Sequence, residues 1–355
     1  MNDQDLPRVV YMLGAGASAQ ALPMVKGIPA ALKAHVELLP TYTPKHAVLG
    51  DNVIEGNDKS HINAIIYDYK NLIQSLADNS ENHESIDTYA KKIFLKTRSL
   101  SFESEEMRRL KLGLSLFFAF LQAKHGKADD RYDGLLASLL QYDEGSGRLQ
   151  LPSDVLILNW NYDQQLAIAF KEYMSNGGIQ GSIEQLGICP LELLSVSRRI
   201  PVRVIQLNGM FCRVAKSNDI IPVAEPNGQQ EDALVREVLK DFAHDKLQTR
   251  AGRGRLLLKF AWELEDGDGE PLKILCDRLQ HCEELVVIGY SFPFFNRMID
   301  RRILKHMPSL RHIYVQAPEG AAQDIIKTIS TMPIPSGCKL EPYTNTAKFL
   351  LPPGL

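Results

Sequence analysis

Short apolar runs recur along this chain, and most of them end at a polar or glycine residue. The first is Val9–Leu13, which a glycine-containing turn follows at once. An uninterrupted apolar run beside such a turn is typical of a strand that is buried on both faces of a parallel sheet. Further runs of this kind lie at residues 154–158, 202–207, 285–288 and 311–316.

Four of these five predicted strands have polar or glycine residues just past their C-terminal ends. In an open parallel sheet, ligands bind at the carboxyl ends of the strands, near the point where the strand order reverses. The pattern therefore predicts an α/β fold with a doubly wound, mainly parallel, Rossmann-like sheet, and it predicts a binding site at that edge.

Apolar positions return at spacings of three and four from about residue 63 to residue 142, as at Ile65, Tyr69 and Leu72. This is the period of a helix with one buried face. Ser85 lies where a helix N-cap is expected. We therefore expect one domain over residues 1–355, with a sheet core at 1–40 and 150–355 and a helical insertion at about 41–149, after the first strand-helix unit.

The turn after the first predicted strand has the residues of a phosphate site, with Gly14, Gly16 and Ser18 at alternate positions. Glycine lets backbone N–H groups approach a pyrophosphate, the following helix N-terminus adds partial positive charge, and serine can bond a phosphate oxygen or cap the helix. Tight strand-to-helix turns also use glycine for steric reasons alone. Both interpretations stay open at this point.

Composition narrows the class of protein. The chain has 355 residues, 23% of them charged, and a formal net charge of −3, so no basic excess points to nucleic acid as the main partner. The N-terminal residues are polar and unlike a signal peptide, and the apolar run near residues 112–121 is too short to span a bilayer. We expect a cytoplasmic protein without a membrane partner.

Five cysteines are present, and none of them forms a Cys-x-x-Cys pair. This spacing speaks against a structural zinc site and against a redox pair. Scattered thiols in a cytosolic protein are usually small buried apolar residues. We therefore expect no metal site.

Four motifs together resemble the sirtuin-like NAD-binding family, in particular its zinc-less branch in bacterial anti-phage defence. They are Gly-Ala-Gly-Ala-Ser at 14–18, Asn-Tyr-Asp at 161–163, Leu-Asn-Gly at 207–209 and Gly-Tyr-Ser-Phe-Pro at 289–293. They occur in the family's order, at the ends of successive predicted strands, and they span nearly the whole chain. The resemblance implies that residues 1–40 and 150–355 form an NAD-binding core.

The resemblance also implies roles for single residues. Asn161 would orient the nicotinamide ribose and the attacking water, and Asp163 would support the asparagine loop. Residues expected to hold NAD are Gly14, Ala15, Gly16 and Ser18 at the pyrophosphate, Gly209 beside the catalytic position, Gly289 and Ser291 near the phosphates and adenosine ribose, and Gln316 at the adenosine. Two alternatives stay open, with Asn161 and Asp163 as caps of the next helix and Ser291 as a turn residue.

The chain departs from the family at Asn208, where the resemblance places a catalytic histidine. An amide can hydrogen-bond to a ribose hydroxyl but cannot take its proton, and loss of a general base costs about 10²–10⁴-fold in rate. The two Cys-x-x-Cys pairs of sirtuin deacylases are missing as well. Protein deacylation is therefore disfavoured, whereas cleavage of the glycosidic bond mainly needs positioning and electrostatic support. His83 is the histidine we would test as a substitute.

The expected function is hydrolysis of NAD to ADP-ribose and nicotinamide, which would deplete NAD in bacterial anti-phage defence. The alternative is an inactive or weakened nucleotide-binding subunit that works with a HerA-type ATPase, with nuclease activity only in such an assembly. In either case we expect a homo-oligomer that contacts nucleic acid only through a partner.

Overall fold

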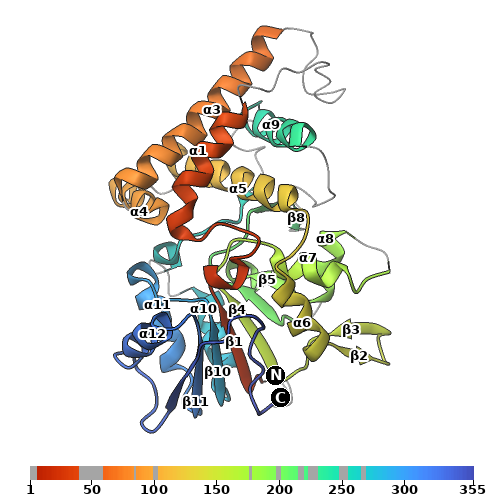
Figure 1. Cartoon of the computed structure of the whole chain (residues 1–355), viewed down its shortest axis with the longest axis vertical. Coiled ribbons are helices and arrows are strands. Elements are labelled where there is room, and N and C mark those ends of the chain that lie inside the picture. The colour runs from red at the N-terminus through yellow and green to blue at the C-terminus, as the bar shows by residue number, and fades with distance from the viewer. Residues whose placement is uncertain are drawn as a thin grey trace. The chain divides into compact units, whose positions relative to one another are not determined.

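Seven parallel strands form the central sheet of this protein in the computed structural model (Figure 1). Every neighbouring pair in this sheet is parallel, which confirms the predicted doubly wound, Rossmann-like α/β fold. In spatial order the strands are β12 (Lys339–Tyr343), β11 (His312–Gln316), β10 (Glu284–Ile288), β1 (Val9–Leu13), β4 (Val155–Asn159), β6 (Val204–Gln206) and β5 (Ile188–Pro190).

The structure describes residues 6–39, 59–83, 85–98, 103–175, 178–196, 201–214, 220–222, 231–247, 255–264 and 269–355. The chain divides into two units. The sheet unit comprises residues 1–20, 128–210 and 259–355, and the helical unit comprises residues 21–127 and 211–258.

The central strand β1 sets the position of the candidate site. All five of its residues are buried, as the apolar run predicts. Its last residue, Leu13, lies level with Asn159 of β4 and Ile288 of β10. The chain runs outward from β1 to β4 and β6, and it later returns to β10 on the other side of β1. The strand order therefore reverses between β1 and β10, where a ligand crevice is expected.

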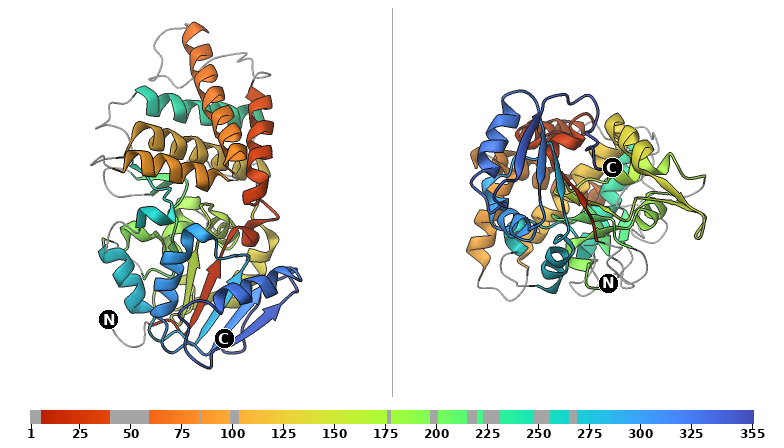
Figure 2. Two further views of the ribbon diagram at one scale, coloured as in Figure 1. Left: turned by 90° about the vertical axis from the view of Figure 1, so that its left-hand side faces the viewer. Right: turned by 90° about the horizontal axis from the view of Figure 1, so that it is seen from below.

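Helices and one hairpin complete the sheet unit (Figure 2). The hairpin pairs β2 (Gln141–Asp143) with β3 (Arg148–Gln150). The α-helices are α6 (Asp130–Leu139), α7 (Gln165–Lys171), α8 (Ile179–Gln185), α10 (Glu270–Arg278), α11 (Arg297–Lys305) and α12 (Ala321–Ile329), and the short 3₁₀ helices are η2 (Ala15–Ser18), η5 (Leu191–Leu193), η6 (Ala261–Leu264) and η7 (Phe294–Asn296).

The helical unit is assembled from two separate stretches of the chain. It holds η3 (Val25–Gly27), α1 (Ile28–Leu38), α3 (Lys59–Asn82), α4 (Ile86–Thr97), α5 (Glu105–His125) and α9 (Glu231–Leu247), with a small antiparallel sheet of β8 (Ile220–Pro222), β7 (Cys212–Val214) and β9 (Arg255–Leu256). The single insertion expected at 41–149 has different bounds. The helix α1, which was expected in the sheet core, joins the helical unit together with α9 and the small sheet, whereas α6 belongs to the sheet unit.

Two residues of the helical unit, Ser85 and His83, were singled out in the sequence. Ser85 is the N-cap of α4, and its hydroxyl accepts from the Thr88 amide at 3.1 Å, as predicted. His83 follows α3, with Nδ1 2.9 Å from the Asn79 carbonyl oxygen and Nε2 3.1 Å from Lys92 Nζ. Its ring is thus engaged at the end of α3 and beside α4.

Candidate functional site

The glycine turn after β1 packs directly on the end of β10. The amide of Gly14 donates to the Ile288 carbonyl at 3.0 Å, and the amide of Gly16 donates to the Gly289 carbonyl at 3.0 Å. A Cβ on Gly16 would lie 2.7 Å from the Cα of Gly289, and a Cβ on Gly14 would lie 2.6 Å from the Cα of Tyr290. The steric interpretation of these glycines therefore holds, since only glycine permits this approach.

The turn continues into η2, whose first residue is Ala15 and whose last is Ser18. An amide at the first position of a helix has no partner within that helix, so Ala15 presents the turn's available backbone donor. The Ser18 hydroxyl is buried, lies 3.2 Å from the hydroxyl of Tyr132, and hydrogen-bonds to the carboxyl group of Asp163. Ser18 thus joins the turn to the end of β4.

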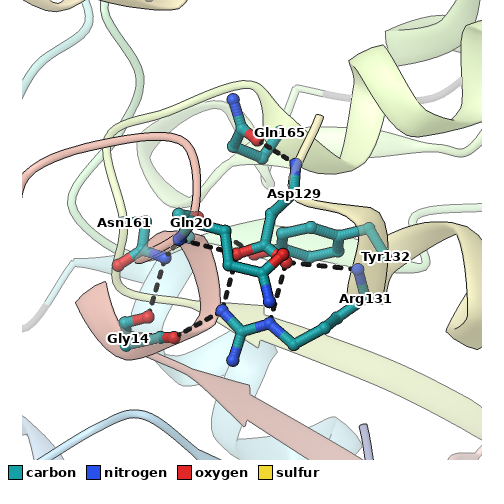
Figure 3. Close-up of polar contacts among 9 residues, drawn as sticks. Gly14, Gln20, Asp129, Arg131, Tyr132, Asn161 and Gln165 are labelled. Atoms are coloured by element: carbon teal, nitrogen blue, oxygen red, sulfur yellow. Dashed lines mark hydrogen bonds and ion pairs between the residues drawn. The ribbon is translucent and has the colours of Figure 1, made fainter. Parts of the chain in front are cut away.

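Asn161 follows β4 and reaches back to the glycine turn (Figure 3). Its Nδ2 donates to the Gly14 carbonyl at 2.9 Å and lies 3.3 Å from the Ser18 hydroxyl. Its backbone amide donates to the Asn159 side chain at 3.0 Å. The side chain is therefore not used to cap α7, and its Oδ1 carries no dashed line in Figure 3.

Asp163 does contact the start of α7, because its Oδ1 accepts from the Gln165 amide at 3.1 Å. Its carboxyl group therefore contacts the N-terminus of α7, as the interpretation of Asp163 as a helix cap expects. Burial raises the pKa of Asp163 to about 6, and the nearby Asp129 raises it as well, while the bonds from Ser18 and Gln165 oppose the shift. Asp163 is consequently a carboxylate near neutral pH that takes up a proton in mildly acidic solution.

This shift predicts a pH dependence of stability. Because the folded state holds the Asp163 proton more tightly than the unfolded chain, the contribution of Asp163 to the free energy of unfolding falls as the pH rises from about 4 to about 6. Asp163→Asn keeps an oxygen for the Gln165 amide and cannot ionise, so it should remove up to about 3 kcal/mol of this fall. Urea unfolding at pH 4, 5, 6 and 7.5 measures the difference, and parallel profiles for the two proteins would contradict it.

Asn208 follows β6, and like Asn161 it donates through its side-chain Nδ2 to a backbone carbonyl. Its Nδ2 donates to the Trp160 carbonyl at 2.9 Å, and its buried Oδ1 has no hydrogen-bond partner among the described residues. The next residue, Gly209, has a φ of 67°, a backbone conformation that favours glycine. The bond to Trp160 thus fixes the orientation of the Asn208 amide.

Sequence reasoning did not single out Asp129 and Arg131, which lie next to the glycine turn (Figure 3). Asp129 is fully buried and accepts from the Arg131 guanidinium at 2.6 and 2.8 Å and from the Gln20 amide at 3.0 Å. Arg131 Nη2 also donates to the Gly16 carbonyl at 2.9 Å. Nothing in the sequence marks this pair, because consecutive charged residues at a helix start usually face solvent.

The end of β10 carries a second buried network. The ring of Tyr290 stacks on Trp160 with centroids 5.6 Å apart, and its hydroxyl donates to the Asp300 carboxyl group at 2.9 and 3.0 Å. Burial raises the pKa of Asp300 well above its usual value. Phe292 is buried with a φ of 52°, which is uncommon for an aromatic residue. These contacts hold Trp160, the residue between Asn159 and Asn161.

Three further residues, Gly289, Ser291 and Gln316, were predicted to contact NAD, and these contacts stay predictions. Gly289 packs on the glycine turn, and Ser291 is exposed. Gln316 uses its whole side-chain amide on the C-terminal segment: Nε2 donates to the carbonyls of Asn345 and Lys348 at 2.5 and 2.6 Å, and Oε1 accepts from the Leu350 amide at 3.0 Å. Contact of Gln316 with adenosine stays a prediction.

The site therefore brings together Gly14, Ser18, Asn161 and Asp163 by direct contact, and Asn208 is joined to them through the backbone of Trp160. Among the described residues, no cluster of His, Cys, Asp or Glu is arranged to hold a metal ion. The described helices include none that is long and apolar enough to cross a membrane. Comparison with protein-family models and with curated proteins finds no match to this chain.

Proposed function

We propose that this protein binds NAD at the carboxyl ends of β1, β4 and β6 and hydrolyses it to ADP-ribose and nicotinamide. One observation carries the proposal. Asn161 and Asn208 each donate through Nδ2 to a backbone carbonyl, of Gly14 and Trp160 respectively, and each therefore presents Oδ1 as an acceptor. The backbone carbonyl oxygen must face an N–H group, so it identifies Nδ2 of each side chain and thereby the position of Oδ1.

Two fixed amide acceptors suit a ribose and a water molecule, whose hydroxyl groups need acceptors of this kind. Asn161 Oδ1 would hold the attacking water or a ribose hydroxyl. Asn208 Oδ1 is buried, so it would accept from a ribose hydroxyl once the groups that cover it move aside. Neither amide can remove a proton, so their contribution is orientation and electrostatic support of the sugar as the glycosidic bond breaks. Asp163 acts indirectly, through Ser18, on the turn that Asn161 contacts.

The resemblance to zinc-less sirtuin-like proteins supports a role in bacterial anti-phage defence, in which NAD hydrolysis depletes the cell of NAD. It also supports self-assembly, so light scattering at micromolar concentration should give a mass above that of one chain. We place the protein in the cytoplasm on the same grounds.

Asn161→Ala should lower NAD turnover by about 10²–10³-fold, because it removes an oriented acceptor at the reacting sugar. Asn208→His places a group that can act as a base at the position where the family has one, and it should raise turnover by up to about 10²-fold. Release of nicotinamide by the purified proteins, followed by chromatography, measures both effects.

Asn79→Ala is the matched control, since Asn79 is a half-buried residue of α3 in the helical unit, with its side chain on the Ser75 carbonyl. This variant should turn over NAD at the wild-type rate. Wild-type turnover in Asn161→Ala would remove Asn161 from the catalytic site and end the hydrolase assignment.

The amide at position 208 also favours a second candidate function, a nucleotide-binding subunit without turnover that serves a HerA-type ATPase. NAD binding by the wild type without nicotinamide release, together with release by Asn208→His alone, would establish this alternative. An assembly with such a partner would then be tested for nuclease activity with DNA and a divalent metal. In this alternative, the partner and not this protein contacts the nucleic acid.

A further inference from the structure

The guanidinium of Arg131 is held at the glycine turn by contacts that leave one nitrogen open. Nε and Nη2 face the Asp129 carboxylate at 2.8 and 2.6 Å, and Nη2 also donates to the Gly16 carbonyl at 2.9 Å. Nη1 has no hydrogen bond to the described residues, and Figure 3 shows it without a dashed line.

This side chain is rigid and almost buried. Its exposed fraction is 9%, and the ring of Phe349 covers the guanidinium at 5.0 Å from the centroid. Tyr132 packs edge-on against the same ring. A planar donor that is already fixed loses little further freedom when it binds an anion. A largely buried cation with an open donor also gains when an acceptor replaces partial hydration.

The glycine turn has few donors of its own for an anion. The amides of Gly14 and Gly16 are taken by the carbonyls of Ile288 and Gly289, and the amide of Ala17 donates to the Gly14 carbonyl. The amide of Ala15 alone cannot neutralise two phosphate groups. A pyrophosphate at this turn therefore needs a positive side chain beside it.

We propose that Arg131 Nη1 binds a phosphate oxygen of the nucleotide at the glycine turn. Nη1 and Nη2 share one edge of the guanidinium plane, and Nη2 already reaches Gly16, so an acceptor on Nη1 lies against the same turn. Asp129 is then the positioning residue, because its carboxylate fixes the plane of the guanidinium. This inference rests on the proposed function, since it takes a nucleotide as the ligand of this turn.

The test compares ADP-ribose, which carries a pyrophosphate, with adenosine, which carries none, in calorimetric titrations. The variant is Asp129→Asn/Arg131→Gln, which removes both charges of the buried pair at once and leaves no unpaired charge behind. Its affinity for ADP-ribose should fall by about 10–100-fold, the range of a charge-assisted hydrogen bond, while its affinity for adenosine stays within about twofold.

Two further variants keep the test decisive. Arg8→Gln removes an exposed guanidinium before β1, paired with Glu283, and should bind ADP-ribose like the wild type. Arg131→Lys keeps the charge but loses the planar fork, and it should bind ADP-ribose about tenfold more weakly even if the double variant does not fold.

The proposal is overturned by unchanged ADP-ribose affinity in a folded Arg131 variant, by an equal loss for adenosine, or by a wild type that does not bind ADP-ribose. Nicotinamide release measured in parallel separates the two ideas. An Arg131-dependent affinity for ADP-ribose without NAD cleavage supports the phosphate contact and counts against the hydrolase. NAD cleavage together with unchanged ADP-ribose affinity in the Arg131 variants supports the hydrolase and counts against the phosphate contact.

Discussion

Gly289→Ala is expected to destabilise the protein by about 3–5 kcal/mol, which combines left-handed backbone strain with severe overpacking. The residue has a φ of 61°, and a Cβ there would lie 2.5 Å from backbone atoms of Gly16 and Ala17. Neither side can yield easily, since hydrogen bonds tie the turn after β1 to the end of β10 and tie Gly289 to Gln316 of β11. Chemical unfolding of the purified variant measures the loss, and insoluble protein is the extreme form of it.

Two other glycines separate the causes of this loss. Gly320 has a φ of 83° and a ψ of −53°, and nothing lies within 4 Å of the position that a Cβ would take, so Gly320→Ala should show backbone strain without overpacking, about 1–3 kcal/mol. Gly134 lies within α6 with open space around it, and Gly134→Ala should gain about 0.5–1 kcal/mol. Equal losses in the Gly289 and Gly320 variants would show that the contact between the two turns adds nothing.

Asp129→Ala is the second large effect, with an expected loss of about 3–5 kcal/mol, because it leaves the nearly buried Arg131 charge without its partner. The substitution also removes the side-chain acceptor for the Arg131 amide at the start of α6. Urea unfolding at pH 7 measures the change.

The exposed pair Lys33–Glu81 provides the comparison, with both side chains more than 40% exposed. Glu81→Ala should cost no more than about 1 kcal/mol, as is usual for a surface ion pair. Removal of both charges in Asp129→Asn/Arg131→Gln should recover much of the stability that Asp129→Ala loses. A loss in Asp129→Ala as small as that in Glu81→Ala would show that Arg131 is adequately solvated without Asp129.

The sequence predicted the five inner strands of the central sheet and missed its two edge strands. Residues of β1, β4 and β10 are almost all apolar, and their runs were recognised. The edge strand β12 exposes most of its side chains and contains Pro342, so it has no apolar run to recognise. The other edge strand, β5, is only three residues long and ends at Pro190.

The site was predicted where the chemistry depends on local sequence, and it was incomplete where it depends on packing. Asn161 and Asn208 lie just past strand ends, where polar residues are expected to gather. Arg131 lies at the glycine turn only because α6 packs there, more than 100 residues along the chain. The engagement of Gln316 was equally hidden, because its partners are backbone groups of the C-terminal segment and carry no side-chain signature.

The place of β1 at the centre of the sheet has a consequence for synthesis of the chain on the ribosome. Both of its neighbours are made later, β4 from residue 155 and β10 from residue 284. At about 5–20 residues per second, an apolar strand with an unpaired edge waits for tens of seconds before β10 emerges. The strand that anchors the site thus keeps one edge unpaired through most of the synthesis of the chain, and a chaperone that covers this edge would protect it.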